Sequence, residues 1–230
     1  MGPEATVCFY NHIIKNTDAG TDQEHMKVII WSDPGVPPRT DAIFRGGESP
    51  VPALKEGVRR LREAGADFIA MPCVTAHYYY KEIAEEAGIP FLSLLEETAG
   101  YFKKELPQVR KVGLLGSSGT INSGIFHYVL ERAGLEVLVP TEDEQENVME
   151  AIFGKEGIKA GFTEGPSREA VVEMAEKLIG RGAEAVIAGC TEIPLVLREE
   201  DIAVPFVDPM LVTARICIKY AGYRLKKQCR

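Results

Sequence analysis

The sequence predicts an α/β fold of two similar three-layer α/β/α lobes, each built on a parallel sheet, with a pseudo-twofold axis relating the lobes. Short apolar runs alternate with longer amphipathic segments, and part of the first half of the chain recurs in the second half. The length of 230 residues fits one large domain or two lobes of about 115 residues each. The recurrence favours two lobes.

The alternation of strands and helices is visible from the spacing of apolar residues. Four runs rich in Val and Ile are typical of buried parallel strands, namely residues 28–30, 68–70, 112–115 and 185–188. Four segments with apolar residues at helical spacing and a charged opposite face are expected to be helices, namely residues 53–63, 76–87, 123–133 and 168–179. The pattern therefore predicts a series of βα units.

An internal repeat defines the expected lobes. Residues 64–73 align with residues 181–190 at an offset of 117, and residues 88–92 align with residues 203–207 at an offset of 115. Repeated segments indicate repeated structural units. We expect a first lobe of residues 1–97 with a returning helix at 208–230, and a second lobe of residues 98–207.

The repeat also predicts a strand that the first lobe does not show. The second lobe is expected to open with a strand near residues 111–115 and a turn at 116–120, whereas residues 1–6 lead directly into a helix. We therefore expect either that the natural protein has a further strand before Met1 or that the first lobe has an incomplete sheet.

The cysteines point to chemistry rather than to cross-linking. The five cysteines are widely spaced and form no Cys-x-x-Cys pair, which excludes a disulfide framework and a zinc site, so no metal is expected. Cys73 and Cys190 end the two matched strands, at the sheet edge where α/β proteins bind ligands. We expect Cys8 and Cys217 to be packing residues and Cys229 to be exposed in a basic tail.

The segments around the two matched cysteines carry a family resemblance. Residues 71–77 (Met-Pro-Cys-Val-Thr-Ala-His) and 189–192 (Gly-Cys-Thr-Glu) closely resemble the two signature motifs of the aspartate/glutamate racemase superfamily. The resemblance extends over essentially the whole chain, through residues 1–6, 38–40, 113–120 and 158–161. The family usually has asparagine after the first cysteine, where this chain has Val74 and therefore lacks an amide that would contact the substrate.

The resemblance implies a function and a set of site residues. It implies a racemase that inverts the α-carbon of aspartate, glutamate or a related amino acid without a cofactor, in a cleft between the lobes of a homodimeric protein. Cys73 and Cys190 would be the catalytic residues, with His77 and Glu192 as possible catalytic support. The residues expected to bind substrate are Arg39, Thr40, Val74, Thr75, Thr120, Lys159 and Thr191.

Elementary chemistry agrees with a pair of thiols. Inverting a carbon requires removal of a proton from one face and delivery of another to the opposite face, and a thiol of suitable pKa can do either. Hydrogen bonds and cations on the substrate carboxylate would stabilise the carbanion, a role suited to Thr75, Thr191, Arg39 and Lys159. A guanidinium in the proline-rich loop before Thr40 also suits bidentate carboxylate recognition.

Other functions compete with this interpretation. A maleate isomerase or hydantoin racemase of the same superfamily would use similarly placed cysteines, and a catalytically silent metabolite-binding module is a further alternative. His77 follows Cys73 at i+4, so it forms either a thiolate–imidazolium pair for nucleophilic catalysis or a bond to a backbone group or carboxylate. The turn at 116–120 could hold a phosphate, although it lacks the lysine of a P-loop.

Charge and hydropathy limit the partners. With 26 Lys and Arg against 34 Asp and Glu, the formal net charge is −8, which excludes a basic nucleic-acid binder. No uncharged stretch approaches the roughly 18 apolar residues of a membrane helix. No secretory signal opens the sequence, so we expect a cytoplasmic protein that binds a small-molecule amino acid, with no membrane or nucleic-acid partner.

Overall fold

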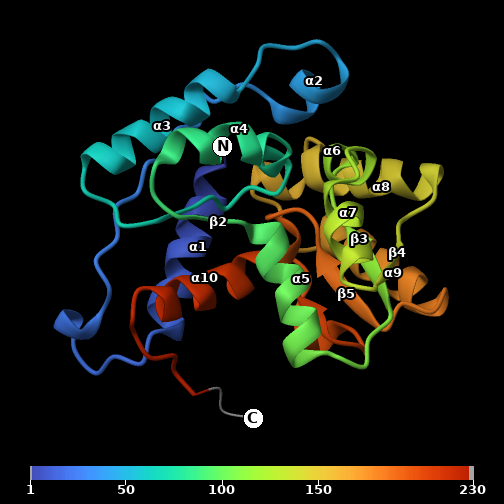
Figure 1. Cartoon of the computed structure of the whole chain (residues 1–230). Helices are drawn as coiled ribbons and strands as arrows, with labels where there is room; N and C mark the ends of the chain where they lie inside the picture. The colour runs from blue at the N-terminus through green and yellow to red at the C-terminus, as the bar shows by residue number, and fades with distance from the viewer. Residues whose placement is uncertain (1, 228–230) are drawn as a thin grey trace. The chain divides into compact units, whose positions relative to one another are not determined.

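The computed structural model describes residues 2–227, which form two compact units. Unit 1 consists of residues 1–97 and 210–230, and unit 2 consists of residues 98–209 (Figure 1). Helix α5 (Leu94–Glu105) crosses the first boundary along the chain. That these two units are the two lobes expected from the sequence stays a prediction.

The sheet of unit 2 has four parallel strands in the order β4–β3–β5–β6. The two inner strands are almost entirely buried, as their continuous apolar sequences require of a sheet covered on both faces. This confirms the strands predicted near residues 112–115 and 185–188. The strands are β3 (Lys111–Leu115), β4 (Glu136–Leu138), β5 (Ala185–Ala188) and β6 (Phe206–Val207).

The core of unit 2 lies between this sheet and helices α8 (Glu142–Phe153) and α9 (Pro166–Gly180). Helix α9 approaches the sheet closely because Gly113 has no side chain, and a Cβ there would lie 3.0 Å from the Cβ of Leu178. Helix α8 begins with a capping box in which Thr141 and Glu144 bond each other's backbone amides. The remaining elements of unit 2 are α6 (Ser118–Asn122), α7 (Ile125–Arg132), η3 (Ile158–Ala160), η4 (Ile193–Leu195) and η5 (Glu199–Asp201).

Unit 1 has a smaller sheet, in which β1 pairs with β2 in parallel. Its apolar core packs against β1 and includes buried residues of the two helices that flank it in sequence, such as Leu54 and Ile83. The elements of unit 1 are α1 (Pro3–Asn16), η1 (Asp22–Glu24), α2 (Arg39–Phe44), α3 (Val51–Glu63), β1 (Ile69–Ala70), η2 (Thr75–Tyr79), α4 (Tyr80–Ala87), β2 (Phe91–Leu92) and α10 (Pro209–Tyr220).

The strand pairs of the two units share one register. In unit 1 Ile69 pairs with Phe91, and in unit 2 Val186 pairs with Phe206, which are the same positions at offsets of 117 and 115. The amide of Ile69 donates to Pro90 over 2.9 Å, and the amide of Val186 donates to Pro205 over the same distance. The repeat found in the sequence is therefore a repeat of backbone hydrogen bonding.

One strand prediction is wrong. Residues 28–30 were expected to form a buried strand, but they are irregular, and Ile29 and Ile30 are each 47% exposed. A strand exists only where a neighbouring backbone pairs with it. Among residues 2–227, no backbone hydrogen bond joins residues 28–31 to another segment. An apolar sequence alone cannot supply that neighbour.

Distant parts of the chain meet within unit 1. Helices α1 and α10 lie side by side (Figure 1), and Arg215 on α10 donates to Asn16 at the end of α1 over 2.8 Å. Beyond the helices, Thr17 forms an antiparallel bridge with Leu225.

None of the described helices is long and apolar enough to cross a bilayer.

The core of unit 2 gives a direct test of this packing. Truncating the fully buried Leu178 to Ala removes contacts with α8 and the sheet, so Leu178→Ala should lower the free energy of unfolding by about 2–5 kcal/mol in urea titrations. Val7→Ala, at a position that is 64% exposed, should change it by no more than about 0.5 kcal/mol. Equal effects of the two changes would contradict the described core.

Candidate active site

The turn that carries Cys190 leaves the sheet at the carboxyl end of β5 and passes very close to the turn after β3. A Cβ on Gly116 would lie 2.8 Å from the carbonyl carbon and oxygen of Gly189, closer than such atoms approach. A Cβ on Gly189 would meet the Leu114 side chain at 2.7 Å. Only glycine fits at both positions, so this pair of glycines allows the two turns to cross.

Thr120 anchors the same turn. It lies in α6, whose first turn is capped by Ser117, and it is fully buried. Its Oγ1 donates a 2.9 Å hydrogen bond to the Gly189 carbonyl. Gln145 on α8 reaches the neighbouring turn and donates to the Gly116 carbonyl over 3.0 Å. The hydroxyl hydrogen of Thr120, predicted to bind substrate, is used to hold the backbone beside Cys190.

Cys190 is linked to a carboxylate and an ammonium. Its Sγ donates to Glu192 Oε2 over 2.9 Å, and the Lys159 Nζ contacts the other carboxylate oxygen, Oε1. Burial and the neighbouring Glu192 charge raise the pKa of the Cys190 thiol well above its ordinary value, so it is held as a thiol. The Thr191 hydroxyl also donates to Glu192, over 3.1 Å.

Glu192 stays ionised although it is buried. Burial alone would raise its pKa, but the Lys159 charge and hydrogen bonds from Cys190, Lys159 and Thr191 outweigh that penalty and lower it. Lys159 also lies with its Nζ 5.4 Å from the centre of the Phe153 ring. The structure therefore joins three predicted site residues of unit 2 to Cys190 in one network of charged hydrogen bonds.

Cys73 follows β1 in unit 1 and lies in a tight turn. Its amide donates to the Met71 carbonyl over 2.8 Å, and its Sγ lies 3.8 Å from the Thr75 hydroxyl. Cys73 is 9% exposed, and Val74 beside it is 3% exposed. The apolar side chain of Val74 is thus buried, while Thr75 is the polar side chain in contact with the thiol.

His77 holds this turn through the backbone and does not pair with the thiol. Its Nδ1 donates to the Cys73 carbonyl over 2.8 Å, and its Nε2 accepts from the Leu94 amide over 3.1 Å. Both ring nitrogens are therefore bonded to the backbone, so of the two alternatives that the sequence left open, the structure shows the bond to backbone groups and not the thiolate–imidazolium pair. Burial lowers the pKa of His77 to about 4, so the ring is neutral near pH 7.

Arg39 and Thr40 begin α2, which packs against η2, the segment that follows Cys73. The Arg39 Nη1 donates to the carbonyls of Val36 and Pro37 over 3.1 and 3.0 Å. The Nε of Arg39 is buried and has no hydrogen-bond partner within residues 2–227. The proline-rich loop thus fixes the guanidinium and leaves a donor available.

The structure groups the predicted residues by unit. Arg39, Thr40, Val74, Thr75 and His77 lie on or beside the Cys73 turn. In unit 2, Thr120, Lys159, Thr191 and Glu192 lie around the Cys190 turn. Sequence reasoning missed Gln145 and the ion pair between Lys159 and Glu192, which are 33 residues apart and share no motif.

The other cysteines lie apart from these turns. Cys217 on α10 is buried, and burial raises its pKa to about 12, as fits the predicted packing role. Cys8 on α1 is only partly buried, and its Sγ lies 3.5 Å from His12 Nε2. The prediction for Cys229 falls outside the described residues.

Among residues 2–227, no cluster of three or more His, Cys, Asp or Glu could hold a metal.

Comparison with known proteins identifies the family. Residues 1–217 match the family model described as Asp/Glu/Hydantoin racemase. The chain belongs to this racemase family. It is therefore an isomerase of the amino-acid racemase type, as the motifs around Cys73 and Cys190 predicted.

Three proteins similar to this racemase match it over almost its whole length. A broad specificity amino-acid racemase, RacX of Bacillus subtilis (strain 168), is 30% identical over 97% of this chain and 96% of its own. The aspartate racemase structure from Picrophilus torridus is 34% identical, covers 98% of this chain and 93% of its own, and superimposes with a TM-score of 0.87. An aspartate racemase homologue from Pyrococcus horikoshii OT3 is 29% identical over 96% and 95% of the chains, with a TM-score of 0.77. These likenesses confirm the α/β fold.

The neutral His77 should make the racemase sensitive to acid. Below pH 6.5 the unfolded chain protonates this histidine, while the folded protein resists protonation down to about pH 4. The free energy of unfolding should therefore fall across that window by about 3 kcal/mol, at about 1.4 kcal/mol per pH unit. His77→Gln should be less stable near pH 7 and show a flatter dependence on pH in urea titrations. If the free energy of unfolding of the two proteins changed with pH in the same way, His77 would not be the source of the acid sensitivity.

The anchor on Gly189 can be tested with a matched pair of variants. Thr120→Val leaves the buried Gly189 carbonyl unpaired and should lower the free energy of unfolding by about 1–3 kcal/mol. Racemase kcat/KM should fall as well, because the turn carrying Cys190 loses its support. Thr120→Ser keeps the hydroxyl and should retain most of the free energy of unfolding and most of kcat/KM. Similar losses in the two variants would show that the methyl group, not the hydrogen bond, matters.

Proposed function

We propose that this chain is a pyridoxal-phosphate-independent racemase that inverts the α-carbon of aspartate, glutamate or a related amino acid by a two-cysteine acid/base mechanism. Cys73 and Cys190 would act on opposite faces of the α-carbon. One would remove the α-proton as a thiolate while the other delivers a proton as a thiol. One proton leaves the α-carbon and one proton is added to it, so the reaction balances without any transfer of electrons to or from another molecule.

One observation carries the proposal: each repeat ends a buried parallel strand with a cysteine turn at the same position. The matched register of β1–β2 and β5–β6 means that the two cysteines are equivalent positions of a repeated unit. Racemisation needs two acid/base groups that exchange roles when the reaction reverses. A duplicated cysteine turn meets that requirement directly.

The surroundings of Cys190 assign it the protonated state at rest. Its raised pKa and its bond to Glu192 favour a thiol, which is the proton donor of the pair in one direction. In the reverse direction the Glu192 carboxylate lies where it can accept the thiol proton as Cys190 becomes the base. Lys159 beside Glu192 compensates its charge and would also attract an anionic substrate.

Arg39 supports recognition of a carboxylate in unit 1. Nη1 is bound to loop carbonyls, and the Nε of this guanidinium is a buried donor without a hydrogen-bond partner among residues 2–227. A substrate carboxylate would satisfy that buried donor, with a hydrogen bond to a charged group contributing about 1.5–3 kcal/mol. The substrate is therefore proposed to be an α-amino acid with Thr40 and Thr75 as further donors near Cys73.

Two further points of the proposal follow from the family. One matched structure is an aspartate racemase, another is an aspartate racemase homologue, and one matched relative is a broad specificity amino-acid racemase, which supports an amino acid as substrate. A homodimer that acts in the cytoplasm, as the sequence led us to expect, completes the proposal. Light scattering of the purified protein tests the dimer.

The mechanism is tested by racemisation in heavy water. Cys73→Ala and Cys190→Ala should each lower kcat by at least about 100-fold, and their losses should not add, since neither thiol completes the inversion alone. In the parent enzyme, deuterium should appear at the α-carbon of the product enantiomer, while the remaining substrate gains little early in the reaction. Mass spectrometry and chiral chromatography measure both quantities.

The controls are the two cysteines outside the turns. Cys8→Ala and Cys217→Ala should keep kcat and change stability only, by about 0.5–3 kcal/mol. A panel of L- and D-amino acids, hydantoins and maleate identifies the substrate. Near-normal racemisation by either turn-cysteine variant would overturn the two-thiol mechanism. Turnover of maleate or a hydantoin alone would replace amino-acid racemisation with one of the other two activities.

A further inference from the structure

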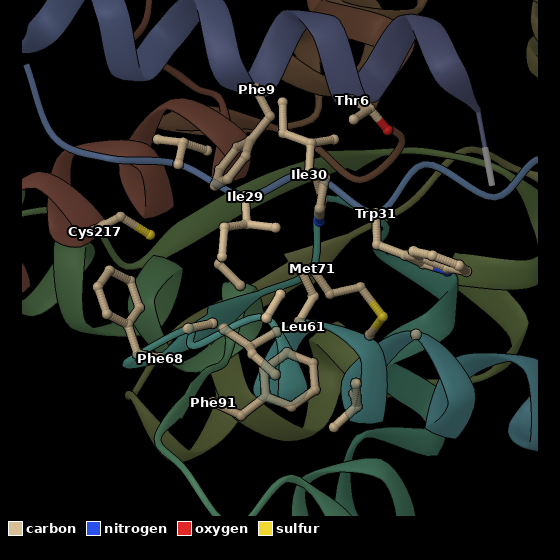
Figure 2. Close-up of a pocket in the computed structure, with 18 of the residues that line it drawn as sticks. Thr6, Phe9, Ile29, Ile30, Trp31, Leu61, Phe68, Met71, Phe91 and Cys217 are labelled. Carbon is tan, nitrogen blue, oxygen red and sulfur yellow. The ribbon is translucent and has the colours of Figure 1, made fainter.

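The apolar hollow of unit 1 and helix α8 of unit 2 differ in what they offer to the cysteine turns. The hollow has a volume of about 420 Å³, and Figure 2 shows Phe9, Ile29 and Phe91 around it. None of the site residues predicted from the sequence, all of which the structure describes, lines this hollow. Helix α8, in contrast, places polar and aromatic side chains beside the surroundings of Cys190.

One side of α8 carries three side chains that contact the segments around Cys190. Gln145, Met149 and Phe153 follow one another at four-residue intervals, so they lie along the same side of the helix. The first two reach the turn after β3, and the ring of Phe153 reaches Lys159. A single helix therefore touches both the backbone beside the thiol and the cation of its charged network.

Gln145 is connected to Cys190 through backbone groups. Its Nε2 donates to the Gly116 carbonyl over 3.0 Å. The carbonyl that precedes Gly116, that of Leu115, accepts from the Gly189 amide over 2.5 Å. Gly116 is thus held on one side by the Gln145 side chain and on the other side by the residue that precedes Cys190.

Ser118 is held by the same helix. It is the first residue of α6, where a backbone amide has no partner within its own helix. This amide donates to the Met149 Sδ over 3.1 Å, and the Ser118 Oγ accepts from Gln145 Nε2 over 3.3 Å. Because a thioether sulfur is a weak acceptor, Gln145 provides the stronger attachment of α8 to this turn.

Gln145 leaves its own amide oxygen unpaired while it makes these contacts. Its nitrogen must face Gly116, because a carbonyl group only accepts hydrogen bonds. The amide oxygen, Oε1, is then buried and has no hydrogen-bond partner among residues 2–227. A buried unpaired oxygen costs stability, which offsets what the nitrogen contributes. The net effect of this glutamine is therefore to fix the Gly116 carbonyl rather than to stabilise the fold.

We propose that Gln145 is a positioning residue for Cys190. It fixes the Gly116 peptide and, through it, the Gly189 peptide that leads into the cysteine. This role rests on the proposed function, in which Cys190 exchanges a proton with the α-carbon. The thiol donates to Glu192 over 2.9 Å. Hydrogen bonds weaken steeply as they bend, so a small rotation of the Gly189 peptide would separate the thiol from its carboxylate.

Two substitutions of similar length remove the donor. Gln145→Met takes the donor from the Gly116 carbonyl but also removes the unpaired oxygen, so Tm should change by no more than about 3 °C. Because the thiol is displaced while the substrate-binding groups stay, kcat should fall by about tenfold or more and KM should change by less than about twofold. Gln145→Glu keeps the shape without the donor and should show at least the same loss of kcat. Chiral chromatography and thermal unfolding measure these quantities.

Alkylation of Cys190 by iodoacetamide is a second readout that needs no turnover. The thiolate is the reactive form, and burial and the neighbouring Glu192 carboxylate both suppress it. In Gln145→Met the loosened turn should therefore raise the alkylation rate of Cys190 by about threefold or more. The rate at Cys73, in unit 1, should not change. Mass spectrometry of the two cysteine peptides measures both rates.

Asn147 provides the matched control. It is an exposed amide on the same helix, so Asn147→Asp should leave kcat, KM and the alkylation rate as in the parent protein. A double variant is informative too, because Thr120 holds the same crossing of turns from the Gly189 side. Gln145→Met combined with Thr120→Val should lose less kcat than the product of the two single losses.

The outcomes separate this role from the proposed function. Parent values of kcat and of Cys190 alkylation in both Gln145 variants would overturn the positioning role and leave racemisation by two cysteines in place. Loss of kcat with a large fall in Tm and faster alkylation at both cysteines would also overturn it, because general destabilisation would then be the cause. Absence of racemisation in the parent protein would overturn the proposed function, and the alkylation rate of Cys190 would still decide whether Gln145 positions the thiol.

Discussion

The parallel register of β5 between β3 and β6 determines where the chain leaves the sheet of unit 2, and the Cys190 turn depends on it. Because the strands run in one direction, their carboxyl ends gather at one edge, and the two turns that start there must cross. They cross where Gly116 and Gly189 leave no room for a side chain. Thr120 then fixes the crossing by a buried hydrogen bond. The position of the thiol is thus a consequence of strand pairing and backbone contact, before any charge is considered.

The two cysteine turns follow strands of equivalent register but differ in charge. Two residues after Cys190 stands Glu192, a buried carboxylate with a lysine partner, whereas two residues after Cys73 stands Thr75, a hydroxyl. Cys190 is therefore held as a thiol by a neighbouring negative charge, and no such charge lies in the Cys73 turn. An ancestral duplication would have given two equal turns. The difference at one position gives the two thiols chemically unequal surroundings.

The sequence was sufficient for features that depend on local pattern and insufficient for those that depend on a distant neighbour. Strands β3 and β5 and both cysteine turns could be predicted because buried parallel strands are continuous apolar runs and the repeat aligns their ends. Residues 28–30 have the same apolar character, but strand formation also needs a backbone partner, which no property of these residues reveals. Likewise, the i+4 spacing of His77 placed it near Cys73 but did not show that Leu94 would occupy its second nitrogen. The Lys159–Glu192 pair arises only when η3 meets the β5 turn, so composition and spacing could not predict it.

The bridge between Thr17 and Leu225 has a consequence for how the protein is made. Unit 1 is assembled from the two ends of the chain, with the whole of unit 2 encoded between them. During synthesis, unit 2 is complete while α1 still lacks the helix α10 against which it packs. Contacts of such long sequence separation form late and slowly. The apolar face of α1, including Phe9 and Ile13, therefore lacks the cover of α10 until residues 209–225 have been synthesised.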